Sequence, residues 1–275
     1  MTPFGARVRA ATAERGPLCA GIDPHPSLLA SWGLGDDVAG LERFTMTAVE
    51  ALAGEVALLK PQSAFFERHG SAGIAVLERA VVAARSLGSL VVLDVKRGDI
   101  GSTAQGYADA YLDPAAPLAV DAITASPFLG VGSLEPMFAT AERHGGGVFV
   151  LALTSNPEGP QVQHARTTAG PTVAATVLAA LAERNAGAQP LGSFGAVVGA
   201  TIGRTDEELD VNGPLLVPGV GAQGGSAESV RAVFGGALPN VLPSSSREIL
   251  SAGPTEQALR DAARRANDEF GALVA

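Results

Sequence analysis

The residues best suited to chemistry stand in one ten-residue stretch, residues 91–100, which reads Val-Val-Leu-Asp-Val-Lys-Arg-Gly-Asp-Ile. Its apolar, β-branched beginning is typical of a strand buried on both faces. Strand side chains alternate between faces, so Asp94 and Lys96 project to the same side near the carboxyl end of the strand. Gly98 ends the strand, and Asp99 follows in the turn. Because a buried charge is costly unless it is paired, we expect the two carboxylates to hold Lys96 protonated, as a proton donor fixed between anions. The alternative is a structural ion pair that only closes the end of a strand.

The composition narrows the class of protein. The chain has 275 residues, 47% of them hydrophobic, and a net charge of −9. This charge argues against a nucleic-acid or anionic-membrane surface but leaves room for a small anionic substrate. Cys19 is the only cysteine, so we expect no internal disulfide and no cysteine-based metal site. The N-terminus lacks the apolar core of a signal peptide, and no apolar run approaches the length of a membrane span. We therefore expect a soluble, cytoplasmic protein with no membrane partner.

The elements that must position this stretch are short apolar runs separated by segments of helical spacing. The runs cover residues 18–23, 55–60, 90–96, 119–125, 147–154, 194–200, 215–220 and 240–244. Helical spacing is clear in residues 73–86 and 172–184, and Ser71, Ser102 and Ser133 are expected helix N-caps. Strand–helix alternation repeated eight times favours an α/β fold of the closed (β/α)8 TIM-barrel type over an open doubly wound sheet. We expect one domain over residues 1–275, with residues 1–16 as a helical extension across the barrel floor.

In such a barrel the active site lies at the carboxyl ends of the strands. These ends are unusually polar here. The residues concerned are Asp23, Lys60, Asp94, Lys96, Thr124, Ser126, Thr154, Ser155 and Arg247.

The last two strand–helix connections predict a phosphate site. Residues 217–225 read Val-Pro-Gly-Val-Gly-Ala-Gln-Gly-Gly, with four glycines whose backbone N–H groups can approach an anion closely. Gln223 adds an amide donor, and Arg247, one strand later, adds a planar guanidinium suited to phosphate oxygens. The alternative is a tight loop beside a surface arginine.

Together these motifs resemble the orotidine 5′-phosphate decarboxylase family. The likeness runs from Gly21 to Arg247 and is similar to the actinobacterial-type (type 2) branch, with its long segment after Pro157. It is carried by Asp94-x-Lys96-x-x-Asp99-Ile100, by Asp23 and Lys60 upstream, by Leu-Thr-Ser-Asn-Pro at 153–157, by the loop at 218–224 and by Ser246-Arg247.

The resemblance implies a homodimeric lyase that converts orotidine 5′-phosphate to UMP and carbon dioxide, the last step of de novo pyrimidine synthesis, with no metal and no organic cofactor. Within it, Asp94, Lys96, Asp99 and Lys60 would be the catalytic residues. Lys96 would protonate C6 of the pyrimidine, Asp94 would lie beside the substrate carboxylate, and Lys60 would orient Asp94 and hold a ribose hydroxyl. Asp99 would cross the dimer interface into the partner's site.

The substrate-binding residues also follow from the resemblance. Asp23 would bind the ribose hydroxyls and Ser155 would meet the pyrimidine. Gln223 and Arg247 would hold the phosphate. The remaining members of this set are Ile100 and Thr103, in the shared region, and Pro218.

The chemistry fits these residues independently of the family. Decarboxylation at an sp² ring carbon leaves a carbanion that no π system delocalises, and a fixed ammonium group can stabilise it and then deliver a proton. Two alternatives stay open. One is a metal-dependent sugar-phosphate decarboxylase or aldolase of the same superfamily, although Lys60 opposes a cation where those relatives carry an acidic residue. The other is a catalytically silent barrel that binds a phosphorylated ligand.

Glu248, beside Arg247, departs from the usual family pattern.

Overall fold

The computed structural model describes residues 1–221 and 224–274 and contains a closed barrel of eight parallel strands in sequential order, β1 to β8. This confirms the predicted (β/α)8 fold. Each strand lies within or at the edge of one of the eight apolar runs. The strands are β1 (Cys19–Ile22), β2 (Leu58–Pro61), β3 (Leu90–Arg97), β4 (Ala122–Ala125), β5 (Gly147–Leu153), β6 (Phe194–Val198), β7 (Leu215–Pro218) and β8 (Val241–Ser245).

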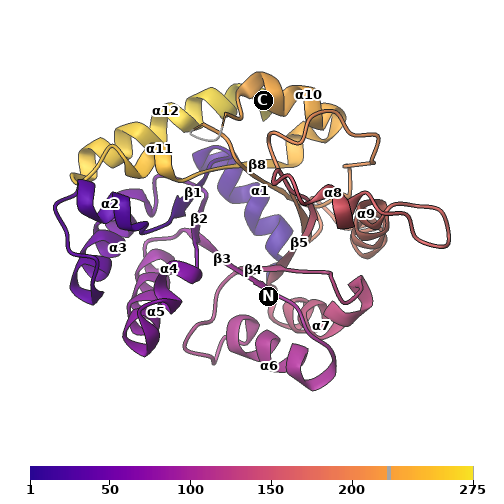
Figure 1. The fold of residues 1–275 in the computed structure, drawn as a ribbon, viewed down its shortest axis with the longest axis horizontal. Helices are drawn as coiled ribbons and strands as arrows, with labels where there is room; N and C mark the ends of the chain where they lie inside the picture. Colours follow the sequence, from indigo (N-terminus) through magenta and orange to yellow (C-terminus); the bar gives the residue numbers. More distant parts are fainter. Residues whose placement is uncertain (222–223, 275) are drawn as a thin grey trace.

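Helices surround the strands on the outside of the barrel, except α1 (Phe4–Arg15), which lies across one end of it (Figure 1). The helices of the chain follow in sequence order. They are α1 (Phe4–Arg15), α2 (Pro26–Ser31), α3 (Val38–Leu52), α4 (Ala64–Glu67), α5 (Gly70–Ser86), α6 (Gly101–Leu112), η1 (Val131–Leu134), α7 (Glu135–His144), α8 (Pro160–Gln163), α9 (Val173–Arg184), α10 (Ala227–Phe234), η2 (Gly235–Asn240), α11 (Arg247–Leu250) and α12 (Glu256–Val274). Within the part of the chain that the structure describes, no helix is long and apolar enough to span a membrane.

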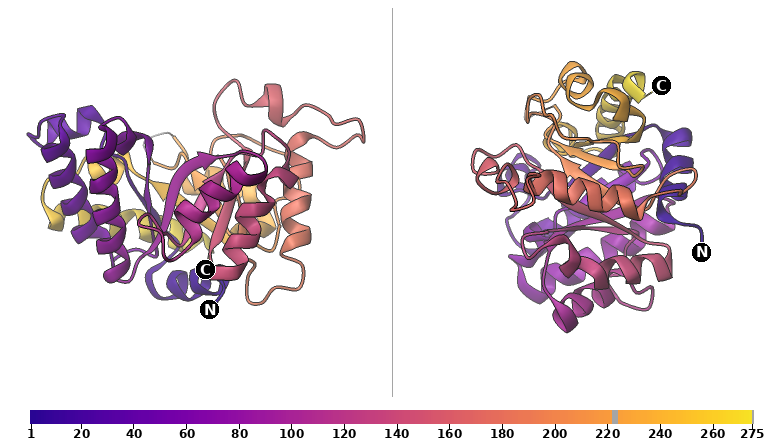
Figure 2. Two further views of the ribbon diagram at one scale, coloured as in Figure 1. Left: turned by 90° about the horizontal axis from the view of Figure 1, so that it is seen from below. Right: turned by 90° about the vertical axis from the view of Figure 1, so that its right-hand side faces the viewer.

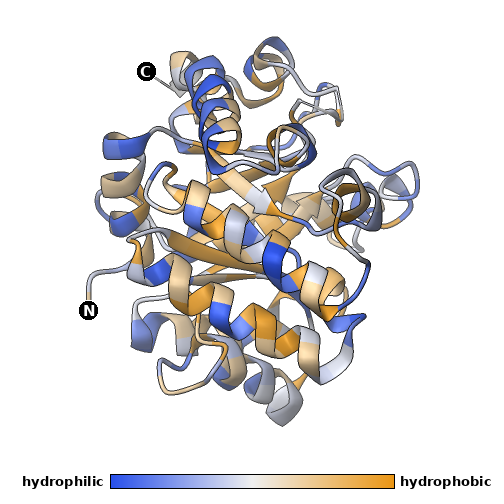
Figure 3. Ribbon diagram, turned by 90° about the vertical axis from the view of Figure 1, so that its left-hand side faces the viewer, coloured by the Kyte–Doolittle hydropathy of each residue, from blue (hydrophilic) through white to orange (hydrophobic). Residues whose placement is uncertain are grey.

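The alternation of strand side chains divides the core into two layers. Alternate residues of the strands, among them Leu58, Val92, Phe149 and Leu216, fill the interior of the barrel. Their neighbours, such as Leu93, pack outward against the helices in a much larger cluster. The strands are accordingly apolar along their length, whereas the helices carry their hydrophilic residues on the outer side (Figure 3). The interior therefore has polar side chains only near the ends of the strands.

Helix α1 closes one end of the barrel. Its Phe4 is fully buried and packs edge-on against Phe149, with ring centroids 5.9 Å apart. Gly147 makes room for this ring, since a Cβ there would lie 2.3 Å from Phe4. Arg7 pairs with the buried carboxylate of Asp121 and donates to the carbonyl of Gly145. Figure 2 shows α1 at the end of the molecule opposite the connection that carries α8.

The predicted N-caps are wrong. Ser71 and Ser102 are the second residues of α5 and α6, and Ser133 lies inside η1. Both α5 and α6 begin at a glycine with positive φ, so the chain turns into the helix before it reaches the serine. At α6 the N-cap position is taken by Ile100, and no side chain caps the helix.

Candidate active site

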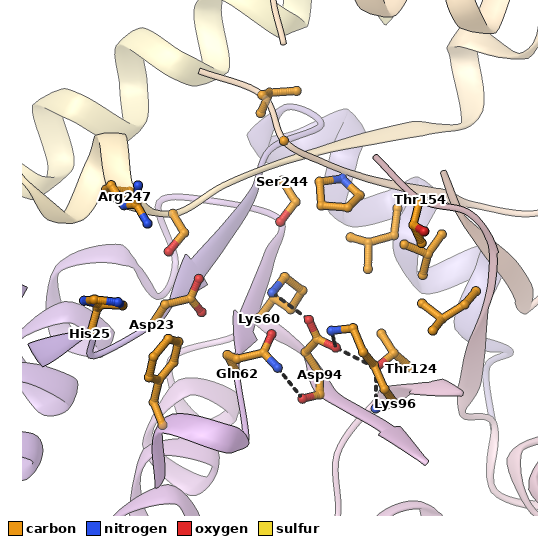
Figure 4. A pocket seen from close by; sticks show the side chains of 18 of the residues that line it. Asp23, His25, Lys60, Gln62, Asp94, Lys96, Thr124, Thr154, Ser244 and Arg247 are labelled. Carbon is orange, nitrogen blue, oxygen red and sulfur yellow. Dashed lines mark hydrogen bonds and ion pairs between the residues drawn. The ribbon is translucent and has the colours of Figure 1, made fainter. Parts of the chain in front are cut away.

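A cavity of about 330 Å³ opens at the carboxyl ends of the strands, and all eight strands or the residues just after them contribute to its wall (Figure 4). Its volume lies at the lower end of the range of about 300–1,000 Å³ seen for ligand pockets. Six of the residues predicted to form a site line it: Asp23, Lys60, Asp94, Lys96, Pro218 and Arg247. The barrel thus brings together side chains that are up to 224 positions apart in the chain, from Asp23 to Arg247.

Asp94 is the centre of the polar array. Its Oδ2 accepts from Lys60 Nζ at 3.1 Å, and its Oδ1 accepts from Lys96 Nζ at 2.6 Å and from the Thr124 hydroxyl at 2.8 Å. Lys60 and Asp94 are buried, whereas the Lys96 side chain is 46% exposed to the cavity. The array therefore consists of a buried carboxylate, Asp94, with hydrogen bonds to both of its oxygens, and one ammonium group, that of Lys96, which a ligand can reach.

The charged groups of this array stabilise one another's ionised forms. Burial by itself would raise the pKa of Asp94, but the ammonium groups of Lys60 and Lys96 outweigh it and lower that pKa to about 2. Burial would likewise lower the pKa of Lys60, and the carboxylates of Asp94 and Asp23 reverse this and raise it above its ordinary value. Below them, burial raises the pKa of the Cys19 thiol to about 12, so the barrel interior under the array stays neutral. Lys60 and Asp94 are therefore both ionised at neutral pH.

Lys96 has an unusual backbone. Its φ is +44°, a region that residues other than glycine seldom adopt, and the pairing of β3 with β4 shifts register between Leu93 and Arg97. The Thr124 hydroxyl holds this conformation, because it accepts from the Lys96 N–H at 2.9 Å while it donates to Asp94. One hydroxyl thus fixes both the carboxylate and the main chain that carries the ammonium group. Backbone strain of this kind is concentrated at functional sites.

Asp99, Ile100 and Thr103 do not line the cavity within one chain. The Asp99 carboxylate accepts from the Ile100 N–H at 2.8 Å, and Ile100 is 62% exposed. Lys96 Nζ pairs with Asp94 and with no other carboxylate of residues 1–221 and 224–274. Within one chain, then, a carboxylate lies between two ammonium groups, the reverse of the arrangement that we predicted from residues 91–100.

Two buried oxygen atoms of the cavity wall have no hydrogen-bond partner within the described part of the chain. Asp23 Oδ1 and Ser246 Oγ make no hydrogen bond with the described residues, although both atoms are shielded from solvent. An unpaired buried polar atom costs about 1–3 kcal/mol, so such atoms in a cavity mark places for ligand hydroxyl or anion groups.

The predicted phosphate site lies at the connection after β7 and the start of α11. Pro218, Gly219 and Val220 line the cavity together with Arg247. Gln223 lies outside the described residues. Glu248 turns its carboxylate against this loop, where a Cβ on Gly221 would lie 1.7 Å from Oε2. The exposed Arg247 guanidinium makes no ion pair with the described part of the chain, so it is available to an anion.

Ser155 does not line the cavity, and its neighbour Thr154 does. The Ser155 hydroxyl lies against Gly199, where a Cβ would come within 2.1 Å of it. Thr154 is held by Gln163 of α8, whose Oε1 accepts from the Thr154 N–H at 2.9 Å and whose Nε2 donates to the Thr154 hydroxyl at 2.6 Å. The segment after Pro157 therefore folds back onto the edge of the cavity.

Sequence reasoning missed several residues of the wall, among them Gln62, Phe65 and Ser244. The Gln62 amide donates to the carbonyl oxygen of Asp94 at 3.4 Å. Gln62 stands two residues beyond Lys60, so the alternation that linked Asp94 to Lys96 also predicts that it faces inward. Phe65 lies on the α4 connection and has no comparable signal in the sequence.

Fold and cavity together define a (β/α)8-barrel enzyme for a small anionic substrate, with paired ammonium and carboxylate groups at one end of the cavity and an unpaired guanidinium at the other. Comparison with known proteins narrows this class. The model of the orotidine 5′-phosphate decarboxylase / HUMPS family matches residues 16–262. The chain is 66% identical over 266 residues to the orotidine 5′-phosphate decarboxylase of Salinispora arenicola, a match that covers 96% of each chain.

Solved structures agree. A crystal structure from Streptomyces avermitilis, described as that of a candidate orotidine 5′-phosphate decarboxylase, has a TM-score of 0.98 and 60% identity, and the match covers 100% of this chain and 96% of that one. The OMP decarboxylase of Leishmania donovani has a TM-score of 0.73 and 29% identity, with 99% of each chain covered. The chain belongs to the orotidine 5′-phosphate decarboxylase / HUMPS family, which confirms the resemblance drawn from its motifs.

Proposed function

We propose that this protein decarboxylates orotidine 5′-phosphate to UMP and carbon dioxide, with Lys96 as the acid that protonates C6. The observation that carries the proposal is the array in which Asp94 accepts from both Lys60 and Lys96 at the floor of the cavity. The relatives of highest identity given above bear the name of this activity. The reaction places the chain at the last step of de novo pyrimidine synthesis.

The array suits the electron flow of this reaction. When the bond from C6 to the carboxylate breaks, the electron pair stays on C6 and carbon dioxide leaves. The Lys96 ammonium stabilises the developing charge and then transfers a proton to C6, and solvent reprotonates the amine. Asp94 holds Lys96 in place and faces the substrate carboxylate, while Lys60 keeps Asp94 ionised and reaches a ribose hydroxyl.

The rest of the substrate has matching groups along the wall. The unpartnered Asp23 Oδ1 accepts from a ribose hydroxyl, and Arg247 binds the phosphate beside Pro218. Gln223 completes the phosphate site in this proposal. Ser155 meets the pyrimidine, and this role follows from the family motif, since in the unliganded chain Thr154 is the residue that lines the cavity.

We further propose a homodimer in which Asp99 enters the partner's site, with Ile100 and Thr103 in the shared region. Support comes from Asp99 lying outside its own chain's cavity and from the exposure of Ile100. A partner's Asp99 would restore the second carboxylate beside Lys96 that one chain does not provide.

The metal-dependent reaction of the wider superfamily is a weaker candidate. Lys60 lies at the end of β2, bonded to Asp94, and its ammonium group repels a divalent cation there. The described residues also contain no cluster of three or more His, Cys, Asp or Glu side chains that could hold a metal ion. Turnover that is unchanged in EDTA is expected for the decarboxylase, whereas loss of turnover would favour the metal-dependent alternative.

The deciding experiment is to follow the absorbance of orotidine 5′-phosphate with purified protein and to identify UMP as the product. Rapid conversion by the wild-type protein, absent in Lys96→Ala, is the expected result. A protein that binds UMP but never converts orotidine 5′-phosphate would instead be the silent binding barrel.

A further inference from the structure

We propose that His25 is a further ligand-binding residue of this site, which donates a hydrogen bond from Nε2 to the 5′-phosphate. This inference rests on the proposed function only in taking the ligand to be a nucleoside 5′-monophosphate. Neither the family motif nor the charged array accounts for this histidine, although it lines the cavity near Asp23 and Arg247 (Figure 4).

The local sequence holds the histidine rigidly. It lies in Asp23-Pro-His-Pro26, where the two prolines restrict the backbone on both sides. The His25 N–H donates to the carbonyl of Asp23 at 2.7 Å, and the chain then enters α2 with Pro26 as the first helical residue. The ring packs edge-on against Phe65, with centroids 5.7 Å apart. A ring constrained in this way loses little freedom when it binds a ligand.

The hydrogen bonds of the ring also determine its tautomer. His25 is the N-cap of α2, and its Nδ1 accepts from the Ser27 N–H at 3.3 Å, with the Ser27 hydroxyl 2.9 Å away. Because Nδ1 is used as an acceptor, the ring proton resides on Nε2. Nε2 makes no hydrogen bond with the described residues. The histidine therefore presents a donor at the wall of the cavity.

The neighbours indicate which ligand group receives this donor. Asp23 is a carboxylate and can only accept, so it suits a ribose hydroxyl, whereas Nε2–H requires an acceptor. Figure 4 shows Arg247 on the same side of the cavity as His25 and Asp23. The unpartnered hydroxyl of Ser246, the residue before Arg247, also lines the cavity. A phosphate is the acceptor-rich group for which such a cluster of donors is suited.

Two substitutions of His25 distinguish its proposed role in ligand binding from its role as the N-cap of α2. Asn is a favoured N-cap residue, so His25→Asn keeps an acceptor for the Ser27 N–H but removes the distal donor. His25→Gln does the reverse, because its amide nitrogen reaches the former position of Nε2. His144→Asn, at the end of α7 on the floor side of the barrel, is the control. The measurement is the Kd of each protein for UMP and for uridine, by calorimetry and by NMR titration.

We expect His25→Asn to bind UMP about ten- to a hundredfold more weakly, as for a lost hydrogen bond to a charged group, with unchanged binding of uridine. His25→Gln should stay within about threefold of the wild type, and the control should match it. Unchanged UMP binding by His25→Asn would overturn the inference, as would an equal loss for UMP and uridine. Because binding is measured apart from turnover, a phosphate-specific loss upholds this role even if the wild-type protein fails to decarboxylate orotidine 5′-phosphate.

Discussion

Lys60 and Lys96 are the only lysines in the chain, beside 17 arginines among its 19 Lys and Arg residues. Both lysines donate to one carboxylate, that of Asp94, at the mouth of the barrel. An arginine stays charged under any condition a protein meets, whereas a lysine can give up its proton and take one back. Outside the site arginine thus takes the place of lysine, and both lysines are confined to the site.

At the residue scale, Lys96→Ala should reduce kcat by at least ~10²–10⁴-fold, since it removes the proposed general acid. Lys96→Arg, which keeps a positive charge but cannot release a proton, should be similarly inactive. Both proteins should keep the circular dichroism spectrum of the wild type, because the Lys96 side chain is half exposed. A variant with a kcat within tenfold of the wild type would remove Lys96 from the mechanism.

A second prediction concerns acid stability. The pKa of Asp94 is depressed from 3.8 to about 2 in the folded protein. A group with a depressed pKa stabilises the fold above its unfolded pKa, and this contribution is lost as the pH falls through the folded pKa. The shift corresponds to about 2 kcal/mol.

The free energy of unfolding of the wild type minus that of Asp94→Asn should therefore be constant above about pH 5 and fall by about 2 kcal/mol toward pH 2. Urea denaturation at a series of pH values measures it. A difference that does not change with pH would mean that the fold does not favour the ionised carboxylate.

At the element scale, the connection between β5 and α9 folds back onto the edge of the cavity at Thr154. Its short helix α8 projects at the open end of the barrel (Figure 2) and supplies Gln163, which holds Thr154 through both its donor and its acceptor. The Thr154 hydroxyl in turn donates to Asn156 at 2.6 Å. The part of the cavity edge formed by Thr154 is therefore held by side-chain bonds within this connection.

We expect Gln163→Leu to raise the KM for orotidine 5′-phosphate several-fold, as for the loss of two hydrogen bonds of about 0.5–1.5 kcal/mol each. The melting temperature should change little, since α8 has no buried residue. Gln161→Leu, at an exposed position of the same helix, is the matched control. Steady-state kinetics that show no difference between the two variants would remove Gln163 from the positioning of this edge.

At the scale of the whole molecule, the exposed apolar side chains point to a partner. Of the large hydrophobic residues that are exposed in the described chain, Ile100, Phe128, Leu129 and Val162 lie in the three consecutive connections after β3, β4 and β5. Apolar surface gathered in this way marks interaction sites. These connections stand beside Asp99, which agrees with the proposed sharing of sites between subunits.

Mixing inactive Lys96→Ala chains with inactive Asp99→Ala chains should then restore about a quarter of wild-type activity. Random exchange makes half of the dimers mixed, and in each mixed dimer one of two sites is intact, as follows from two-fold symmetry. Activity and subunit exchange are both measured, the latter with differently tagged chains. If exchange occurs without recovery of activity, Asp99 acts in its own chain's site.

The sequence by itself determined the barrel and most of the cavity wall. Eight apolar runs that end in polar residues are a local pattern, and strand alternation is enough to place Asp94 and Lys96 on the same face. The general rule that parallel strands end at one edge then gathers Asp23, Lys60 and Arg247 into one site. None of these inferences needs the register of one strand against another.

Only the tertiary structure decided which partner each polar group contacts. Lys60 from β2 and Thr124 from β4 reach Asp94 because of the strand register, and the register shift after Leu93 gives Lys96 its positive φ. The same holds for Ser155, which turns to Gly199 just after β6, and for His25, whose tautomer depends on the turn that caps α2. Periodicity fixes the face of a strand on which a side chain lies, but its hydrogen-bond partners come from neighbouring strands and loops, whose relative positions are set by the packing of the closed barrel.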